Sequence, residues 1–233
     1  MGNIIIEQTY KRNYAGGVVV FLSFFSIIAA FFLKYPGVDL YVSHLFYDKS
    51  TRSFFSGDIV VSFANHFLNL LAVLLALCIV VFVVKTYAKR KSNPHHYKNA
   101  LYIALVAVVG YLFLVAFVSK HTFKRPRPED IVEFGGTVNF IPAFVIGNQC
   151  KQDCSFVSGH STIGFMLYSI AFLFKKGEKK RTMWFIAATI SGLICGFIRI
   201  MAGKHFLSDV IFSGLIMYGT AASLAHVMKL SEK

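Results

Sequence analysis

Long runs of apolar residues limit this chain to folds that a lipid bilayer can surround. Five runs carry almost no charge: Gly17–Leu33, Phe67–Val84, Ala100–Val118, Met183–Ile198 and Val210–Val227. A sixth run, Phe156–Phe174, is apolar except in its first turn. About 20 apolar residues suffice for a helix to cross the hydrocarbon core. The sequence therefore predicts an all-α, polytopic membrane protein with six transmembrane helices.

The bulk composition supports the same conclusion. Of 233 residues, 56% are hydrophobic and only 15% are charged, which is unlike an ordinary soluble domain. The chain contains no internal repeat and no linker long enough to separate two domains. We therefore expect a single integral membrane domain over residues 1–233, and the sequence predicts no oligomeric state.

The positive charges predict the orientation of these helices. Most of the 24 lysines and arginines fall in segments 11–12, 85–98, 175–181 and 229–233. This bias favours both termini in the cytoplasm. The outer loops are then 34–58, 120–156 and 201–209, and half of their positive charges lie in the second loop. We assign that excess to an anion site and expect no nucleic-acid partner.

The four cysteines divide into two kinds. Cys78 and Cys195 lie inside apolar runs, where we expect small buried hydrophobic side chains. Cys150 and Cys154 lie in the second outer loop. An oxidising compartment would permit a disulfide between them, and two free thiols are the alternative.

Polar residues gather where the apolar runs end on the outer face. In "RIMAGKHFLSD", His205 and Asp209 are four residues apart, so on a helix they share one face. The carboxylate can accept the proton of one imidazole nitrogen and leave the other nitrogen as a nucleophile or base. Arg199 ends the preceding run and can bind an oxyanion beside that imidazole.

Two further clusters suit the binding of a tetrahedral anion. Lys120 and Arg127 are separated by six residues in "KHTFKRPRP", and prolines on both sides stiffen Arg127. In "CSFVSGHS", Ser158 and Gly159 begin a predicted helix whose amides can bind an anion, and His160 can protonate a leaving oxygen. Each cluster also has an ordinary alternative, because helix-end cations often reach lipid headgroups and serine is a common N-cap.

Together the three clusters resemble the type 2 phosphatidic acid phosphatase (PAP2) superfamily, which includes the vanadium haloperoxidases. The family pattern is K-x6-RP, then PSGH, then SR-x5-H-x3-D. The corresponding residues are Lys120-x6-Arg127-Pro128, Val157-Ser158-Gly159-His160 and Ile198-Arg199-x5-His205-x3-Asp209. Valine and isoleucine replace a proline and a serine, so the departures affect no charged residue. "DLYVSHLFYD" (39–48) also looks like the first outer loop of bacterial members.

The resemblance implies a membrane phosphatase with a haloperoxidase-like core that forms a phosphohistidine and needs no cofactor. It implies that His205 attacks phosphorus, that Asp209 orients His205, and that His160 protonates the departing alcohol. The phosphoryl oxygens would be held by Lys120, Arg127, Ser158, Gly159 and Arg199. The 11 acidic residues include only one within the clusters, so the sequence also offers few ligands for a metal.

The segment "CSFVSGH" looks most like bacterial lipid A phosphatases, in particular the 4′-phosphatase type. We therefore expect lipid A as the substrate, at the periplasmic face of the inner membrane. Phosphatidylglycerol phosphate, undecaprenyl pyrophosphate and phosphatidic acid are alternative substrates, and transfer to a lipid hydroxyl is an alternative reaction. An anion channel or transporter would need charges within the apolar runs, which they lack. We expect Lys124 and Arg125 to attract anionic lipid without specificity.

Overall fold

A computed structural model describes residues 2–55 and 59–230 of the chain, without the side chains of residues 2–13 and 60. Helices make up nearly all the regular structure of these residues. The longest are α1 (Gly2–Lys34), α3 (Ile59–Ala88), α8 (Lys179–Met201) and α9 (Leu207–Val227). A further long rod consists of α4 (Pro94–Leu105), a π-helical stretch η2 (Val106–Ser119) and one last turn, α5 (Lys120–Phe123). Within the described residues, five helices are long and apolar enough to cross a membrane. The predicted all-α, multi-pass class is confirmed.

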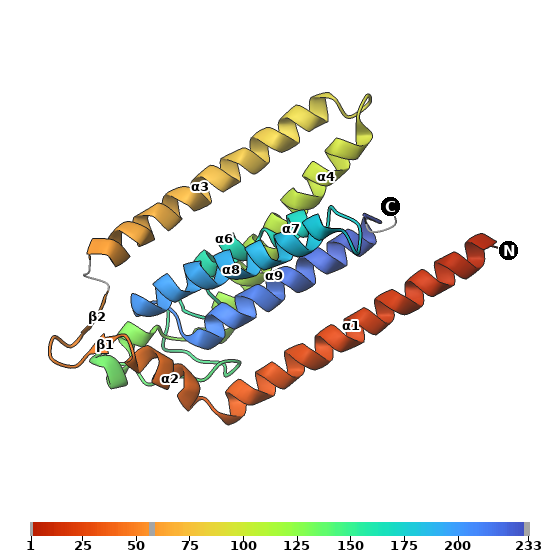
Figure 1. Cartoon of the computed structure of the whole chain (residues 1–233). Coiled ribbons are helices and arrows are strands. Elements are labelled where there is room, and N and C mark those ends of the chain that lie inside the picture. The colour runs from red at the N-terminus through yellow and green to blue at the C-terminus, as the bar shows by residue number, and fades with distance from the viewer. Residues whose placement is uncertain (1, 56–58, 231–233) are drawn as a thin grey trace.

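The sixth predicted span takes a different form from the other five. Residues 156–174 form two short helices, α6 (Gly159–Phe165) and α7 (Tyr168–Ala171). The helix tightens between them, where the amide of Leu167 donates to the carbonyl of Gly164 and not to the residue four positions back. Neither helix alone is long enough to span a bilayer, although the segment runs along the bundle (Figure 1). Six crossings therefore stay a prediction.

The helices around α6 pack closely because small residues line their contact. A side chain added at Gly164 would lie 2.5 Å from the backbone nitrogen of Gly192 on α8, so only glycine allows this crossing. On the other side of the core, the hydroxyl of Tyr102 donates to the carbonyl of Ala221 at 2.9 Å and joins α4 to α9. These contacts hold the end of α6 against the middle of α8 and join α4 to α9.

Two helices flank this central bundle on opposite sides (Figure 1). α1 packs on α9 through aromatic rings, with Phe25 and Phe212 centred 5.2 Å apart. α3 lies on the other side, and its buried side chains include Leu68 near its N-terminal end. Most other side chains on α1 and α3 are exposed and apolar, as expected of helices that face lipid.

The two ends of the bundle differ in composition. The first and last described residues lie at the same end of the bundle (Figure 1). At the other end are α2 (Gly37–His44), a hairpin of β1 (Tyr47–Asp48) and β2 (Ser53–Phe54), and the short 3-10 turns η3 (Pro128–Asp130) and η4 (Val132–Phe134). Tyr47 pairs with Phe54 in the antiparallel hairpin. Phe54, Ile131, Phe134 and Phe206 form a small core beneath these loops, which gives the loops a fixed position over the helix ends.

Candidate active site

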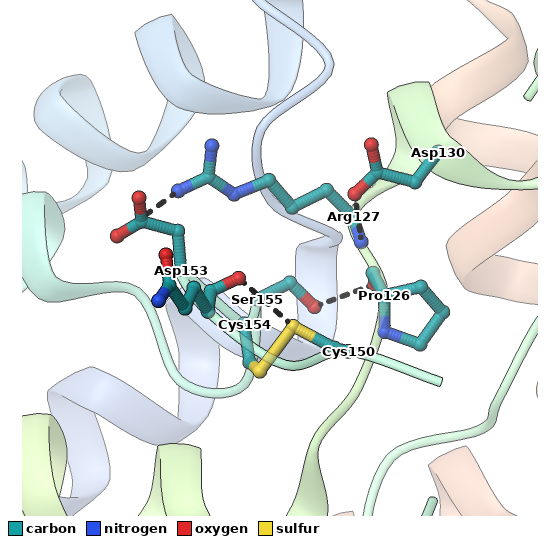
Figure 2. The surroundings of a disulfide bond; sticks show 8 residues. Pro126, Arg127, Asp130, Cys150, Asp153, Cys154 and Ser155 are labelled. Carbon is teal, nitrogen blue, oxygen red and sulfur yellow. Dashed lines mark hydrogen bonds and ion pairs between the residues drawn. A yellow bond between two sulfur atoms is a disulfide. The ribbon is translucent and has the colours of Figure 1, made fainter. Parts of the chain in front are cut away.

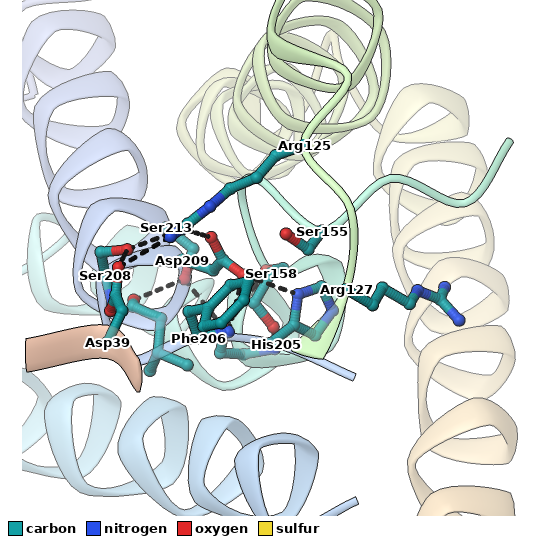
Figure 3. A network of polar contacts seen from close by, with 12 residues as sticks. Asp39, Arg125, Arg127, Ser155, Ser158, His205, Phe206, Ser208, Asp209 and Ser213 are labelled. Carbon is teal, nitrogen blue, oxygen red and sulfur yellow. Dashed lines mark hydrogen bonds and ion pairs between the residues drawn. The ribbon is translucent and has the colours of Figure 1, made fainter. Parts of the chain in front are cut away.

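A fully buried arginine joins two aspartates at the loop end of the bundle (Figure 3). The guanidinium of Arg125 donates to Asp209 at 2.6 Å and to Asp39 at 2.8 Å. Ser208 accepts from Arg125 at 2.8 Å and donates to Asp39 through both its amide and its hydroxyl. Burial raises the pKa of Asp39, and the charge of Arg125 opposes that shift. We call Asp39, Arg125, Ser208 and Asp209 the ionic cluster.

His205 lies against the ionic cluster. Its Nδ1 is 3.4 Å from Asp209 Oδ2, which also accepts from the amide of Phe206 at 2.8 Å. The spacing predicts that His205 and Asp209 share one helical face. In the structure His205 precedes α9, so the two residues meet across the start of the helix instead. Burial lowers the pKa of His205 to about 4, and Asp209 opposes that shift. At pH 7 the imidazole is therefore neutral, with Nε2 on the side away from Asp209.

Three cations lie near the two histidines of the site. Lys120 is close enough to Arg127 and Arg199 for the three charges to repel one another. The nearest carboxylate oxygen of Glu129 is 3.7 Å from Arg127, which is longer than a hydrogen bond. The Nε atoms of both arginines are buried without a hydrogen-bond partner among the described residues. We call Lys120, Arg127 and Arg199 the cationic face, whose unpaired donors suit an anion of more than one charge.

The start of α6 lies beside these groups. The hydroxyl of Ser158 accepts from the amide of Ser161 at 3.4 Å, so Ser158 caps the helix, as its ordinary alternative predicts. Its own proton can still be donated to a ligand. A side chain added at Gly159 would meet only Tyr111, at 3.6 Å. The backbone at Gly159 is therefore open to close approach by a ligand.

His160 completes the set. Its electrostatic environment includes four other predicted groups, namely Lys120, Arg127, Arg199 and His205. Its Nε2 lies 2.7 Å from Asn69 Oδ1. The structure thus brings together all eight residues that the sequence predicts for the site, which come from three separate segments of the chain.

Backbone and side-chain contacts hold the three motifs in register. The amide of Ser158 donates to the carbonyl of Asp209 at 3.1 Å, which joins the second motif to the third. Ser155 donates from its amide to Arg125 and from its hydroxyl to Pro126, which joins the second motif to the first. Lys204 contacts both oxygens of Glu129, at 2.5 and 2.6 Å, and joins the third motif to the first. The site therefore depends on loop contacts as well as on helix packing.

The predicted disulfide between Cys150 and Cys154 is present (Figure 2). It closes a short loop directly before Ser155, so it lies next to the junction of the first two motifs. Asp153 of this loop approaches Arg127 to 3.9 Å. Cys195 is buried as expected, but the expectation for Cys78 is wrong: it is exposed on α3, on a face of the helix that none of the described residues covers.

Sequence reasoning missed four residues of this region, and it misplaced one of them. Arg125 was expected to attract lipid from the surface, yet it is fully buried and paired with two carboxylates. Asp39 was noticed only as part of a loop that resembles relatives. Asn69 lies in the apolar run Phe67–Val84 and Asn65 lies just before it, and they contact His160 and Arg199. Two asparagines four residues apart at the start of such a run were the available signal, because polar side chains there need partners.

The described residues contain no group of three or more His, Cys, Asp or Glu side chains arranged to hold a metal ion. Asp209, which lies beside His205, and Asp39 are both engaged by Arg125. What the arrangement offers is a neutral imidazole oriented by a carboxylate, a second imidazole and three converging cations. Those groups can bind a phosphate ester, supply a nucleophile and supply a proton.

Comparisons with known proteins agree with this description. Residues 99–233 match the PAP2 superfamily. The chain is 34% identical over 189 residues to a lipid A 4′-phosphatase of Francisella tularensis subsp. novicida, covering 81% of this chain and 85% of the relative. It is 25% identical over 231 residues to a lipid A 4′-phosphatase of Rhizobium etli, covering 92% and 89%. It is 27% identical over 216 residues to a lipid A 4′-phosphatase of Rhizobium leguminosarum, covering 84% and 91%. No solved structure matches.

Proposed function

Because the chain belongs to the PAP2 superfamily, we propose that it removes the 4′-phosphate of lipid A through a phosphohistidine intermediate. The chain is a multi-pass membrane lipid phosphatase, that is, a phosphoric monoester hydrolase. The observation that carries the proposed chemistry is the position of the His205–Asp209 pair beside the cationic face. The names of the three relatives support lipid A as the substrate and the 4′ position as the bond that is cleaved.

In the proposed first step, His205 Nε2 forms a bond to phosphorus while the bond from phosphorus to the ester oxygen breaks. Asp209 Oδ2 lies 3.4 Å from Nδ1, longer than a good hydrogen bond, and in the proposed step it closes on the Nδ1 proton, so the lone pair on Nε2 is available for attack. The electron pair of the broken bond goes to the ester oxygen, which takes a proton from His160. In the second step water attacks phosphorus, returns a proton to His160 and releases inorganic phosphate from His205.

The remaining residues hold the phosphoryl group during both steps. The cationic face binds its oxygens and offsets the charge that develops on them in the transition state. Ser158 and the amide of Gly159 approach from the start of α6, next to His160. No cofactor enters this scheme, because the nucleophile, the acid and the positive charge all come from side chains of the chain.

The proposed location is the inner membrane of a bacterium, with both termini in the cytoplasm and the site facing the periplasm. Both ends of the described chain lie opposite the site (Figure 1), which agrees with a site on the side away from the termini. A disulfide beside the site suits an oxidising compartment. The partner in this location is the phosphorylated lipid itself, whose phosphates lie at the depth of the headgroups.

A panel of lipid phosphates tests the proposal directly. Purified full-length protein and a His205→Ala variant are incubated in mixed micelles with lipid A, phosphatidylglycerol phosphate, undecaprenyl pyrophosphate and phosphatidic acid. We expect phosphate release from lipid A at the 4′ position and none from the variant. Preferred release from another lipid would overturn the substrate, and a doubly phosphorylated lipid product would indicate transfer. An active His205→Ala variant would overturn the phosphohistidine.

A further inference from the structure

Two asparagines on α3 contact groups of the active site from a helix that none of the three motifs includes. Asn69 Oδ1 lies 2.7 Å from His160 Nε2, and Asn65 Oδ1 accepts from Arg199 at 2.6 Å. The two asparagines are four residues apart, so they lie on one face of α3. Leu68, between them, is buried, whereas Asn65 is half-buried and Asn69 is exposed, so this face of α3 lies at the edge of the site.

The composition of α3 makes this placement specific. The helix is strongly apolar over most of its length, and its uncharged polar side chains gather at the end where the site lies, with Asn65 and Asn69 among them. An amide in a membrane-spanning helix is costly unless it has a partner. Here each amide has a partner in the site, and each contact is short.

We propose that Asn69 positions His160, the proposed proton donor, and that Asn65 positions Arg199. This inference rests on the proposed function and extends it to the side of the site from which the alcohol departs. In the substrate-loaded site His160 starts the step doubly protonated, because the phosphate dianion offsets the surrounding cations. Asn69 Oδ1 accepts a hydrogen bond from the Nε2–H group of His160, and the Nδ1–H group gives its proton to the ester oxygen as the phosphorus–oxygen bond breaks. His160 ends this step neutral, with its Nε2 proton still held by Asn69.

The choice of an amide and not a carboxylate fits the role of a proton donor. Asp209 carries a charge that stabilises a cationic His205 ring, as a phosphohistidine requires. His160 has to give its proton away, and a neutral amide orients the ring without adding a negative charge that would retain the proton. The charged and titrating groups that face His160 are Arg199, His205, Lys120 and Arg127, which also favour release of a proton.

The test compares Asn69→Ala, Asn69→Asp and Asn65→Ala with the wild type and with Leu70→Ala, a lipid-facing control on the same helix. The full chain is used, with lipid A or whichever lipid of the panel the wild type hydrolyses. For each variant kcat and KM are measured across pH, and the thermal unfolding midpoint in detergent checks folding. A misplaced donor lowers kcat by roughly tenfold to a hundredfold, so we expect that loss for Asn69→Ala with KM within about twofold.

Asn69→Asp provides a readout that a structural role would not move. Its carboxylate favours the protonated imidazole, so the alkaline limb of the kcat profile should move to higher pH and part of the rate should return. Asn65→Ala should raise KM more than it lowers kcat, since Arg199 binds the phosphoryl group. Wild-type kinetics in Asn69→Ala, or equal losses in both Asn69 variants with an unmoved alkaline limb, would overturn the inference. An active His205→Ala protein would instead overturn the proposed function.

Discussion

Arg125 and Arg127 are two residues apart in the chain and occupy opposite electrostatic environments. Arg125 has no exposed surface and donates to Asp39, Asp209 and Ser208. Arg127 keeps 19% of its side chain exposed, and the closest carboxylate contact of its guanidinium to a described residue is 3.7 Å. Figure 3 shows the Arg127 guanidinium pointing away from the group that holds Arg125. The first arginine is a closed part of the structure, and the second is available to a ligand.

The same contrast holds for the two sides of His205. The ionic cluster behind it has two carboxylates and one guanidinium, so its net charge is negative when both carboxylates are ionised. The cationic face in front of it has three positive groups and no close carboxylate partner for Arg199 within the described residues. An imidazole between them can gain positive charge on attack while the phosphoryl oxygens are held in front. The ionic cluster therefore stabilises the charged ring of His205, and the cationic face binds the substrate.

Of the changes considered, removal of Arg125 from the ionic cluster should have the largest effect on stability and activity. In Arg125→Ala, two buried carboxylates lose their cation, and breaking a buried ion pair costs about 3–5 kcal/mol. We expect a much lower thermal unfolding midpoint in detergent together with loss of phosphatase activity. Arg125→Lys keeps the charge but not the forked donors, and it should fall between the two. A wild-type midpoint in Arg125→Ala would show that the ionic cluster does not support the fold.

Removal of the front arginine should separate activity from stability. Arg127→Ala takes away an oxyanion donor whose guanidinium makes no hydrogen bond to a described residue, so kcat/KM should fall about 10²- to 10³-fold. The unfolding midpoint should stay within experimental error of the wild type. Lys124→Ala, which removes a nearby exposed cation, is the matched control and should change kcat/KM by no more than about twofold to threefold. Equal effects of these two variants would reduce the cationic face to general attraction of anions.

The sequence predicts the residues of the cationic face far better than those of the ionic cluster. Lys120, Arg127 and Arg199 belong to motifs with fixed spacing, and all eight predicted residues meet in space. Arg125 was misassigned because a charge between prolines and a lysine looks like surface, and nothing local reveals two distant carboxylates. Asp39 contacts Ser208 across 169 positions of sequence, a pairing that only the tertiary fold creates. Burial of a charge depends on distant partners, so it escapes local reasoning.

The fold divides in the same way between local and distant causes. Hydropathy alone predicts the five long helices, because crossing a bilayer demands a long apolar run. It does not predict that residues 156–174 break into α6 and α7. The close crossing at Gly164 and Gly192 depends on where α8 returns in space. The small core under the outer loops likewise joins residues from three separate segments.

The position of His205 between the two sides should be visible in its titration. Burial lowers its pKa to about 4, so the ring is neutral above that pH and gains a proton only as the pH falls through it. Nuclear magnetic resonance of labelled histidine in detergent, with His205→Ala to assign the signal, measures this midpoint in the free protein. We expect a midpoint about two pH units below the ordinary value near 6.5. A midpoint near 6.5 would mean that water reaches the ring and that the rear is not closed.

Loss of the disulfide should have the smallest effect on activity, and that effect should act through the cationic face. The loop that Cys150 and Cys154 close is short, so its loss costs about 2 kcal/mol or less by loop-closure entropy, and it carries Asp153, which approaches Arg127. We expect the double variant Cys150→Ser/Cys154→Ser to raise KM by a few-fold and to leave kcat within about twofold, because His205 and Asp209 are untouched. Reduction of the wild type with dithiothreitol should reproduce this change, and the double variant should not respond to it. A large fall in kcat without a rise in KM would place the disulfide among the supports of the ionic cluster, since Ser155 beside it also contacts the backbone of Arg125.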